Sequence, residues 1–281
     1  MLLIADSGGT KTDWRLIKNR DISSSIKTLG INPYYLNEEQ IRNEIRNNFT
    51  DRPVNESVDV VYFYGAGCSG REKQEIVHSV LNETFSKAEI VISSDVLGAA
   101  RALCRHKAGI ACVIGTGSGS CLYDGKEIKA SIPSLGFILG DEGGGAYLGK
   151  RLLQDYLRGD MPQEIISDLR AEFEINKDLV LENVNRRPMP GRYLASFSEF
   201  IHQHVKSEYI HNLVYSSFSD FTDHYITRYP ECHSIPAYFS GSIAYYFSDI
   251  LKSLLKTRDI RVARIIESPM NDLVDFHIES L

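Results

Sequence analysis

Residues 2–18 read LLIADSGGTKTDWRLIK, and this stretch bears most directly on the fold. The apolar run 2–5 ends at Asp6, a turn rich in Gly, Ser and Thr follows over residues 6–12, and a second strand-like segment covers residues 13–18. Residues 110–123 repeat the order, with an apolar run (110–114), the turn GTGSGS (115–120) and a strand (121–123). Strand, turn and strand are the pattern of a β-hairpin. Two such hairpins, each opening about half of the chain, predict a duplicated architecture.

The rest of the chain alternates between strand-like and helix-like patterns. In the first half we expect strands near residues 22–29, 58–64 and 89–93, and helices over 37–48, 71–85 and 96–104. In the second half we expect helices over 144–157, 162–173, 194–206, 209–228 and 243–255, a loop over 183–191, and strands over 237–240 and 261–266. Such alternation is typical of α/β layers around a parallel or mixed sheet.

Composition excludes several classes of partner and setting. The 281 residues are enough for two domains, and the formal net charge of −6 comes without any block of Lys and Arg. This argues against nucleic acid or an anionic membrane as a partner. The five cysteines show no C-x-x-C pair, no secretion leader is recognisable, and no apolar run approaches the ~20 residues that span a bilayer. We therefore expect a soluble, cytoplasmic protein.

The turn over residues 6–12 has the chemistry of a phosphate-binding loop. Its glycines allow the backbone to approach an anion, and Thr10 and Thr12 add hydroxyl groups. Asp6 can hold a hydrated Mg²⁺, which prefers carboxylate oxygen. The alternative is a plain hairpin whose polar side chains satisfy turn hydrogen bonds. The second turn at residues 115–120 favours the phosphate interpretation, because two such turns can hold one polyphosphate from opposite sides.

Two carboxylates lie at positions where ligands often bind. Asp95 follows the strand 89–93, and the carboxyl end of a strand is the usual ligand-binding edge of an α/β sheet. A carboxylate there can accept the proton of an attacking hydroxyl. Asp141 lies in GFILGDEGGG (136–145), where five glycines exceed what a helix cap requires. For both residues the alternative role is that of a helix N-cap.

A competing motif is GAGCSG over residues 65–70, which matches the G-x-G-x-x-G fingerprint of dinucleotide-binding proteins. The strand before it is not the first of the chain, and a dinucleotide site leaves the other two glycine turns unexplained. We therefore favour the pair of phosphate loops.

Seven segments in order resemble one known family. They are DSGGTKT (6–12), GINP (30–33), GAG (65–67), SD (94–95), GTGS (115–118), GDEG (140–143) and SGS (240–242). Together they resemble the N-acetylglucosamine kinase-like branch of the BadF/BadG/BcrA/BcrD ATPase family, within the superfamily of sugar kinases, actin and heat-shock ATPases. The similarity spans nearly the whole chain.

The resemblance implies two ribonuclease-H-like domains, residues 1–107 and 108–264, flanking a nucleotide cleft, with residues 265–281 packing back on the first. It implies ATP-dependent phosphorylation of an amino-sugar hydroxyl, foremost N-acetylglucosamine to its 6-phosphate, otherwise N-acetylmuramic acid or glucosamine. The cofactors are then ATP and Mg²⁺, and related kinases suggest a homodimer. Asp95 matches the catalytic base of the family. ATP would contact Gly8, Gly9, Thr10, Lys11, Thr12, Gly115, Thr116, Gly117, Ser118, Gly241 and Ser242. The sugar would contact Asn32, Gly65, Thr116, Gly117 and Asp141.

Two other functions remain open at this stage. One is a sensor that binds ATP and sugar without catalysis, although such a protein needs neither Asp6 nor Asp95. The other is a radical-activating ATPase of the same broad family, whose iron–sulfur cluster requires thiolate ligands at a subunit interface. The unpaired spacing of the cysteines argues against the second.

Overall fold

The computed structural model describes residues 1–279, so residues 280 and 281 of the expected C-terminal segment lie outside the described part of the chain. The chain divides into two compact units. The first comprises Met1–Lys107, Tyr123–Ile128 and the segment that begins at Ser268. The second comprises Ala108–Leu122 and Lys129–Glu267.

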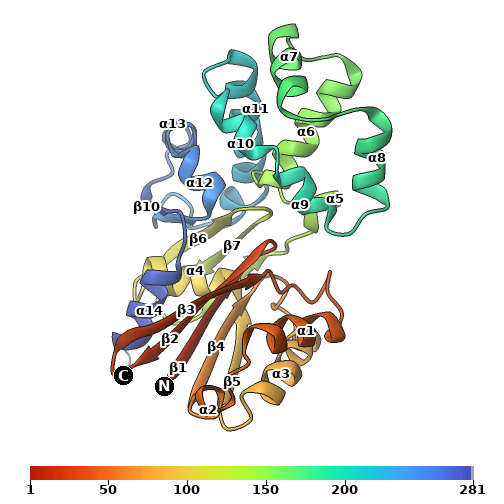
Figure 1. Ribbon diagram of the computed structural model, residues 1–281. Helices are drawn as coiled ribbons and strands as arrows, with labels where there is room; N and C mark the ends of the chain where they lie inside the picture. The colour runs from red at the N-terminus through yellow and green to blue at the C-terminus, as the bar shows by residue number, and fades with distance from the viewer. Residues whose placement is uncertain (280–281) are drawn as a thin grey trace. The chain divides into compact units, whose positions relative to one another are not determined.

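The first unit is built on a five-stranded sheet with the order β3-β2-β1-β4-β5 (Figure 1). The strands are β1 (Leu2–Ser7), β2 (Lys11–Lys18), β3 (Asp21–Leu29), β4 (Val60–Gly65) and β5 (Glu89–Ser94). β1 pairs antiparallel with β2 and parallel with β4, which in turn pairs parallel with β5. In this register Ser7 lies opposite Gly65, and Gly65 opposite Ser94. The carboxyl ends of β1, β4 and β5 therefore meet at one edge.

Helices cover both faces of this sheet. They are α1 (Glu38–Asn48), α2 (Arg52–Asn55), α3 (Arg71–Thr84), α4 (Asp95–Cys104) and α14 (Met270–Glu279). Leu3 and Ala5 of β1 belong to the core cluster shared with α1 and α3, whereas Leu2 and Ile4 belong to the cluster shared with α4 and α14. Successive side chains of a strand point to opposite faces, so residues 2–5 of β1 are all apolar because the strand is buried on both sides.

The second unit holds a five-stranded sheet with the order β10-β9-β6-β7-β8. The strands are β6 (Gly109–Ile114), β7 (Ser118–Tyr123), β8 (Ile128–Ile132), β9 (Ala237–Ser240) and β10 (Val262–Ile266). β9 pairs parallel with both β6 and β10, and Ser240 lies opposite Val113 and Ile266. The segments that follow β6 and β9 therefore emerge at the same edge. Two mixed sheets with flanking helices confirm the predicted α/β class.

The helices of this unit bury one large apolar core. They are α5 (Gly136–Leu139), α6 (Gly145–Arg158), α7 (Gln163–Glu172), α8 (Lys177–Asn185), α9 (Pro190–Ala195), α10 (Ser198–Gln203), α11 (Glu208–His224), the 3₁₀ turn η1 (Ile226–Arg228), α12 (Ser242–Tyr246) and α13 (Ser248–Thr257). Leu148 and Leu152 of α6 and Phe218 and Phe221 of α11 lie three to four residues apart, the spacing that places side chains on one helix face.

Four local predictions are wrong. The helices expected over 194–206 and 243–255 are each broken, at Phe197 and Phe247, whose rings are almost fully buried. The loop expected over 183–191 is shorter, because α8 continues to Asn185 and α9 begins at Pro190. The turn at 115–120 is also shorter, since the Gly115 amide donates to the Gly117 carbonyl and β7 begins at Ser118.

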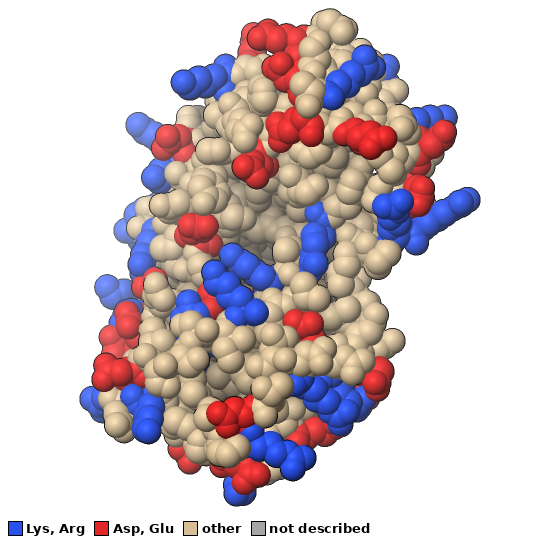
Figure 2. All heavy atoms as spheres, viewed as in Figure 1, with Lys and Arg blue, Asp and Glu red and all other residues tan. Residues whose placement is uncertain are grey.

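The surface carries charges of both signs. On the face seen in Figure 2, acidic and basic side chains are interspersed, without a continuous basic area. Among residues 1–279, no helix combines the length and apolarity that a membrane span requires.

Candidate active site

The edge at which β1, β4 and β5 end brings three predicted site residues together. Asp6 is the penultimate residue of β1, Gly65 ends β4, and Asp95 follows β5 directly. The Ala66 amide donates to the Ser7 carbonyl at 2.8 Å, which continues the pairing of β1 and β4 past Gly65. Because parallel strands present their carboxyl ends at the same edge, this is where an α/β sheet usually binds ligands.

Buried hydroxyls hold the first glycine turn in place. Ser7 Oγ lies 2.7 Å from Thr12 Oγ1 and accepts a hydrogen bond from the Ile31 amide at 3.0 Å. Thr12 Oγ1 donates to the Leu29 carbonyl at 2.9 Å. The Thr12 side chain is fully buried and anchors the turn, whereas Thr10 and Lys11 are exposed. Any ligand of this turn therefore meets Gly8, Gly9, Thr10 and Lys11 first.

Gly30 supports the same turn from behind. Its amide donates to the Thr10 carbonyl at 3.0 Å. A Cβ atom at this position would lie 2.4 Å from the Gly8 carbonyl oxygen and 2.8 Å from the Thr10 nitrogen. Only glycine fits such a close approach of two backbones. Gly30 was not among the predicted site residues, although the motif GINP at 30–33 contained the signal.

Asp6 lies among other carboxylates. Asp13 of β2 lies opposite Asp6 in the strand register. The guanidinium of Arg15 forms an ion pair with Asp13. Burial, and then the negative charges of Asp95 and Asp13, raise the pKa of Asp6 to about 7, against a smaller opposing effect of Lys11. A divalent cation would relieve this repulsion, and Mg²⁺ is commonly held by one or two carboxylates together with phosphate oxygens. The residues present therefore fit a magnesium ion.

Asp95 is not the cap of its helix. The N-cap of α4 is Ser94, whose Oγ accepts a hydrogen bond from the Leu97 amide at 3.3 Å. Asp95 is the first helical residue, and its Oδ1 accepts from the Val96 amide at 2.9 Å. The same carboxylate adds to the effect of burial in raising the pKa of Cys68 to about 12, which keeps that thiol protonated. The alternative role of N-cap is therefore wrong for Asp95.

Asn32 has a fixed orientation beside the GAGCSG loop. Its Oδ1 accepts a hydrogen bond from the Tyr34 amide at 2.9 Å. Gly67 has φ +80°, and a Cβ atom there would lie 2.4 Å from that same oxygen. With Oδ1 engaged, Nδ2 is the part of the carboxamide that can donate to a ligand.

In the second unit, the turns after β6 and β9 lie in direct contact. Gly241 has φ +118°, and a Cβ atom there would lie 2.3 Å from the Ile114 carbonyl oxygen. Amides at the start of α6 close over the β6–β7 turn, since Gly145 donates to the Gly115 carbonyl at 2.8 Å and Ala146 to the Thr116 carbonyl at 2.9 Å. The structure thus brings residues 115–117, 144–146 and 241–242 together.

Asp141 is held in this same cluster. It is only 8% exposed and adopts φ +57°, a left-handed conformation that is uncommon for a residue with a side chain. Its Oδ1 accepts from the Ser118 amide at 3.3 Å and from Ser134 Oγ at 3.2 Å. Burial raises its pKa, and these two hydrogen bonds partly offset the rise. The N-cap of α6 is Gly144, so the alternative role of N-cap is wrong for Asp141 as well.

Neighbouring side chains that sequence reasoning missed support this loop. Lys150 Nζ donates to the Phe137 carbonyl at 3.0 Å and so ties α6 to α5. A Cβ atom at Gly143 would lie 2.9 Å from Phe221 Cβ, so α11 packs directly beneath the glycines. No local pattern predicts these contacts, because they join elements far apart in the chain.

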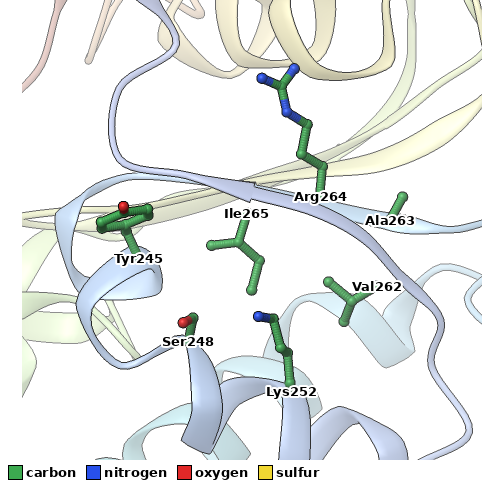
Figure 3. Close-up of a pocket in the computed structure, with 7 residues that line it drawn as sticks. All are labelled: Tyr245, Ser248, Lys252, Val262, Ala263, Arg264 and Ile265. Carbon is green, nitrogen blue, oxygen red and sulfur yellow. The ribbon is translucent and has the colours of Figure 1, made fainter.

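A pocket of about 310 Å³ lies elsewhere in the second unit, between α12, α13 and β10 (Figure 3). It is lined by Tyr245, Ser248, Lys252, Val262, Ala263, Arg264 and Ile265. None of the predicted site residues lines it, although Tyr245 belongs to the helix that Ser242 begins.

The cysteines lie inside the protein. All five are buried, and none of them forms a disulfide bond. Within residues 1–279, no group of three or more His, Cys, Asp and Glu side chains is arranged to hold a metal ion.

Comparison with solved structures identifies the family. The chain is 39% identical to a candidate N-acetylglucosamine kinase from Porphyromonas gingivalis, with a TM-score of 0.92 over 99% of both chains. The chain belongs to the N-acetylglucosamine kinase-like branch of the BadF/BadG/BcrA/BcrD ATPase family. No protein-family model and no curated protein matches it.

More distant structures share the fold of this N-acetylglucosamine kinase-like family. A candidate N-acetylglucosamine kinase from Chromobacterium violaceum is 16% identical, with a TM-score of 0.72 over 98% of both chains. A glucokinase of the ROK family from Streptomyces griseus, solved with glucose and AMPPNP, is 15% identical, with a TM-score of 0.59 over 98% of this chain and 97% of its own. At these identities the likeness concerns the actin-like ATPase fold alone.

Proposed function

We propose that this protein is an ATP-dependent kinase that phosphorylates the 6-hydroxyl of N-acetylglucosamine or a closely related amino sugar. The observation that carries the proposal is the meeting of Asp6, Gly65 and Asp95 at the carboxyl edge of β1, β4 and β5. Its 39% identity to a candidate N-acetylglucosamine kinase supports the choice of acceptor.

Asp95 would act as the general base. The sugar hydroxyl oxygen forms a bond to the γ-phosphorus, the bond from that phosphorus to the β–γ bridging oxygen breaks, and ADP leaves. The hydroxyl proton passes to the Asp95 carboxylate. In-line transfer of this kind depends mainly on positioning and on neutralising charge.

The glycine turns would bind the nucleotide. Gly8, Gly9, Thr10 and Lys11 form the part of the first turn that solvent reaches, and Gly115, Thr116 and Gly117 form the second turn. Gly241 and Ser242 would lie against the adenosine. Asp6 would hold Mg²⁺, which when bound supplies positive charge against the phosphates; the carboxylates around Asp6 fit that role.

The sugar would be bound by complementary polar groups. Asn32 offers a donor in its Nδ2, because its Oδ1 is already engaged by the Tyr34 amide. Asp141 offers an acceptor in Oδ2, because Ser118 and Ser134 both donate to its Oδ1. Hydroxyl groups of a sugar serve both as donors and as acceptors, so either side chain can pair with a sugar hydroxyl.

The direct test is coupled ADP release with Mg·ATP against N-acetylglucosamine, N-acetylmuramic acid, glucosamine and glucose, with a control that contains no sugar. We expect turnover that depends on an amino sugar and exceeds the rate with glucose. Measurable binding of ATP and sugar without turnover for any acceptor would contradict the proposal and favour a sensor.

A further inference from the structure

A lysine lies close to Asn32 in the first unit. Lys73, the third residue of α3, places Nζ 5.2 Å from the centre of the Tyr34 ring. Its side chain is only 24% exposed. Tyr34 itself is 65% exposed, which is unusual for so large an apolar ring. The aromatic face and the ammonium group together form a corner open to small molecules.

Tyr34 ties this corner to the proposed sugar site. Its amide donates to Asn32 Oδ1 at 2.9 Å, and its ring carbon Cδ2 would lie 3.0 Å from a Cβ atom at Gly67. The backbone of Tyr34 thus orients Asn32, while its ring carries the ammonium of Lys73. Asn32, Tyr34 and Lys73 belong to one packed group within the first unit.

The charge of Lys73 is poorly matched by the protein. Within the described residues, the carboxylate that pairs with it is that of its neighbour Glu72, at 3.5 Å and 85% exposed. Such exposed pairs contribute little to stability, since solvent and salt screen them. The attraction between an ammonium group and an aromatic face is similarly weak at an exposed site. Because both contacts are weak, the ammonium group of Lys73 can also pair with the carboxylate of a ligand.

We propose that Lys73 makes the acceptor site selective for amino sugars that carry a carboxylate substituent, with the sugar ring against Tyr34 and the carboxylate paired with Lys73. The inference rests on the proposed function, because it takes Asn32 as a sugar ligand. Ring C–H groups pack on the aromatic face, and a charge-assisted hydrogen bond joins carboxylate and ammonium.

The test compares N-acetylmuramic acid with N-acetylglucosamine, which differ by one carboxylate-bearing ether at O3. kcat/KM for both sugars is measured in the wild type, Lys73→Gln, Lys73→Arg and Arg71→Gln. Arg71→Gln is the matched control, because Arg71 is a cation in the same helical turn, is 92% exposed and pairs with Glu75. We expect Lys73→Gln to lower kcat/KM for the acidic sugar about 10-fold or more, the scale of a hydrogen bond to a charged group. The value for N-acetylglucosamine should stay within about twofold.

Two further results are expected. Lys73→Arg should retain most of the preference for the acidic sugar, and Arg71→Gln should leave it unchanged. Raising the salt concentration should weaken binding of N-acetylmuramic acid but not of N-acetylglucosamine, because salt screens charge pairs at a partly exposed site.

The inference is wrong if Lys73→Gln lowers kcat/KM equally for both sugars or for neither, or if the wild type uses N-acetylglucosamine but not the acidic sugar. Failure of the proposed function looks different, because then neither sugar is phosphorylated. In that case titration calorimetry of both sugars decides. The inference is supported if the wild type binds N-acetylmuramic acid more tightly than N-acetylglucosamine and Lys73→Gln does not. It is overturned if the wild type binds N-acetylmuramic acid equally or more weakly.

Discussion

The phenol oxygen of Tyr64 lies 2.8 Å from Nε2 of His277, although 213 residues separate the two in the chain. Arg101 Nη1 donates to the same phenol oxygen at 2.6 Å, and the ring of Tyr62 stacks on His277 at 4.0 Å. Tyr64 precedes Gly65 at the end of β4, and Arg101 lies on α4, which begins at Asp95. This buried network therefore ties α14 to the two elements that carry Gly65 and Asp95.

Tyr64→Phe should destabilise the first unit. The change removes the hydroxyl with which both the Arg101 guanidinium and the His277 ring form a hydrogen bond. A buried polar group that loses its partner costs ~1–3 kcal/mol of stability. We expect the urea midpoint to fall with an unchanged slope. Tyr245→Phe is the control, because that ring is 45% exposed and should leave the midpoint unchanged. Equal midpoints for Tyr64→Phe and the wild type would contradict the role of the network.

His277 should make stability depend on pH. Burial, and then the charge of Arg101, lower its pKa from 6.5 to about 4. The unfolded chain therefore binds more protons than the folded protein between these values, so stability is full above pH 6.5 and falls as the pH falls toward 4. In urea unfolding at pH 7 and pH 5, His277→Gln should lose less stability than the wild type over this interval. An equal loss in both proteins would rule out His277 as the source.

Asp6 should have the opposite effect. Its pKa is raised from 3.8 to about 7, so the folded protein binds more protons than the unfolded chain over that interval. Its contribution to stability is full below pH 4 and is lost as the pH rises through 7. Asp6→Asn should therefore gain stability relative to the wild type between pH 4 and pH 8, as measured by thermal unfolding. At pH 8, magnesium with ATP should reduce the difference in thermal midpoint between Asp6→Asn and the wild type. If that difference did not change with pH, the raised pKa of Asp6 would be contradicted.

Gly30→Ala should weaken ATP binding. The added Cβ atom would lie 2.4 Å from the Gly8 carbonyl oxygen, so the first glycine turn has to shift. Overpacking of this kind costs ~1–3 kcal/mol, and if that cost falls on the ATP-binding form, the Kd for ATP should rise by about 5- to 150-fold. Gly70→Ala is the matched control, because no atom lies within 4 Å of the Cβ position there. Similar affinities for ATP in the two variants would show that the packing behind the turn is unimportant.

Asp95→Asn should separate catalysis from binding. The amide oxygen can still accept from the Val96 amide, so α4 should begin as before, but the side chain no longer takes up a proton. General-base catalysis is worth ~10²–10⁴-fold, and kcat should fall by that factor while the Kd for ATP stays unchanged and the thermal midpoint does not fall. Near-normal turnover would remove Asp95 from the mechanism.

Much of the fold follows from local chemistry. The hairpins at residues 2–18 and 109–123 are readable because apolar runs and Gly, Ser and Thr turns act over a few residues. The breaks at Phe197 and Phe247 are not readable, since both segments have good helical patterns. There the burial of a large ring in the core overrides the local preference.

For the site, local sequence indicates which residues lie at or beside the strand ends, including Asp6, Gly65 and Asp95, because the apolar runs end within two residues of those strand ends. Which residues lie next to them depends on long-range packing. Asp13 comes beside Asp6 through strand register, Gly30 comes behind Gly8 through backbone packing, and the ring of Tyr34 comes under Lys73. Such contacts join residues that are far apart in the chain, or that face each other only once strands and helices are packed, and no local pattern encodes them.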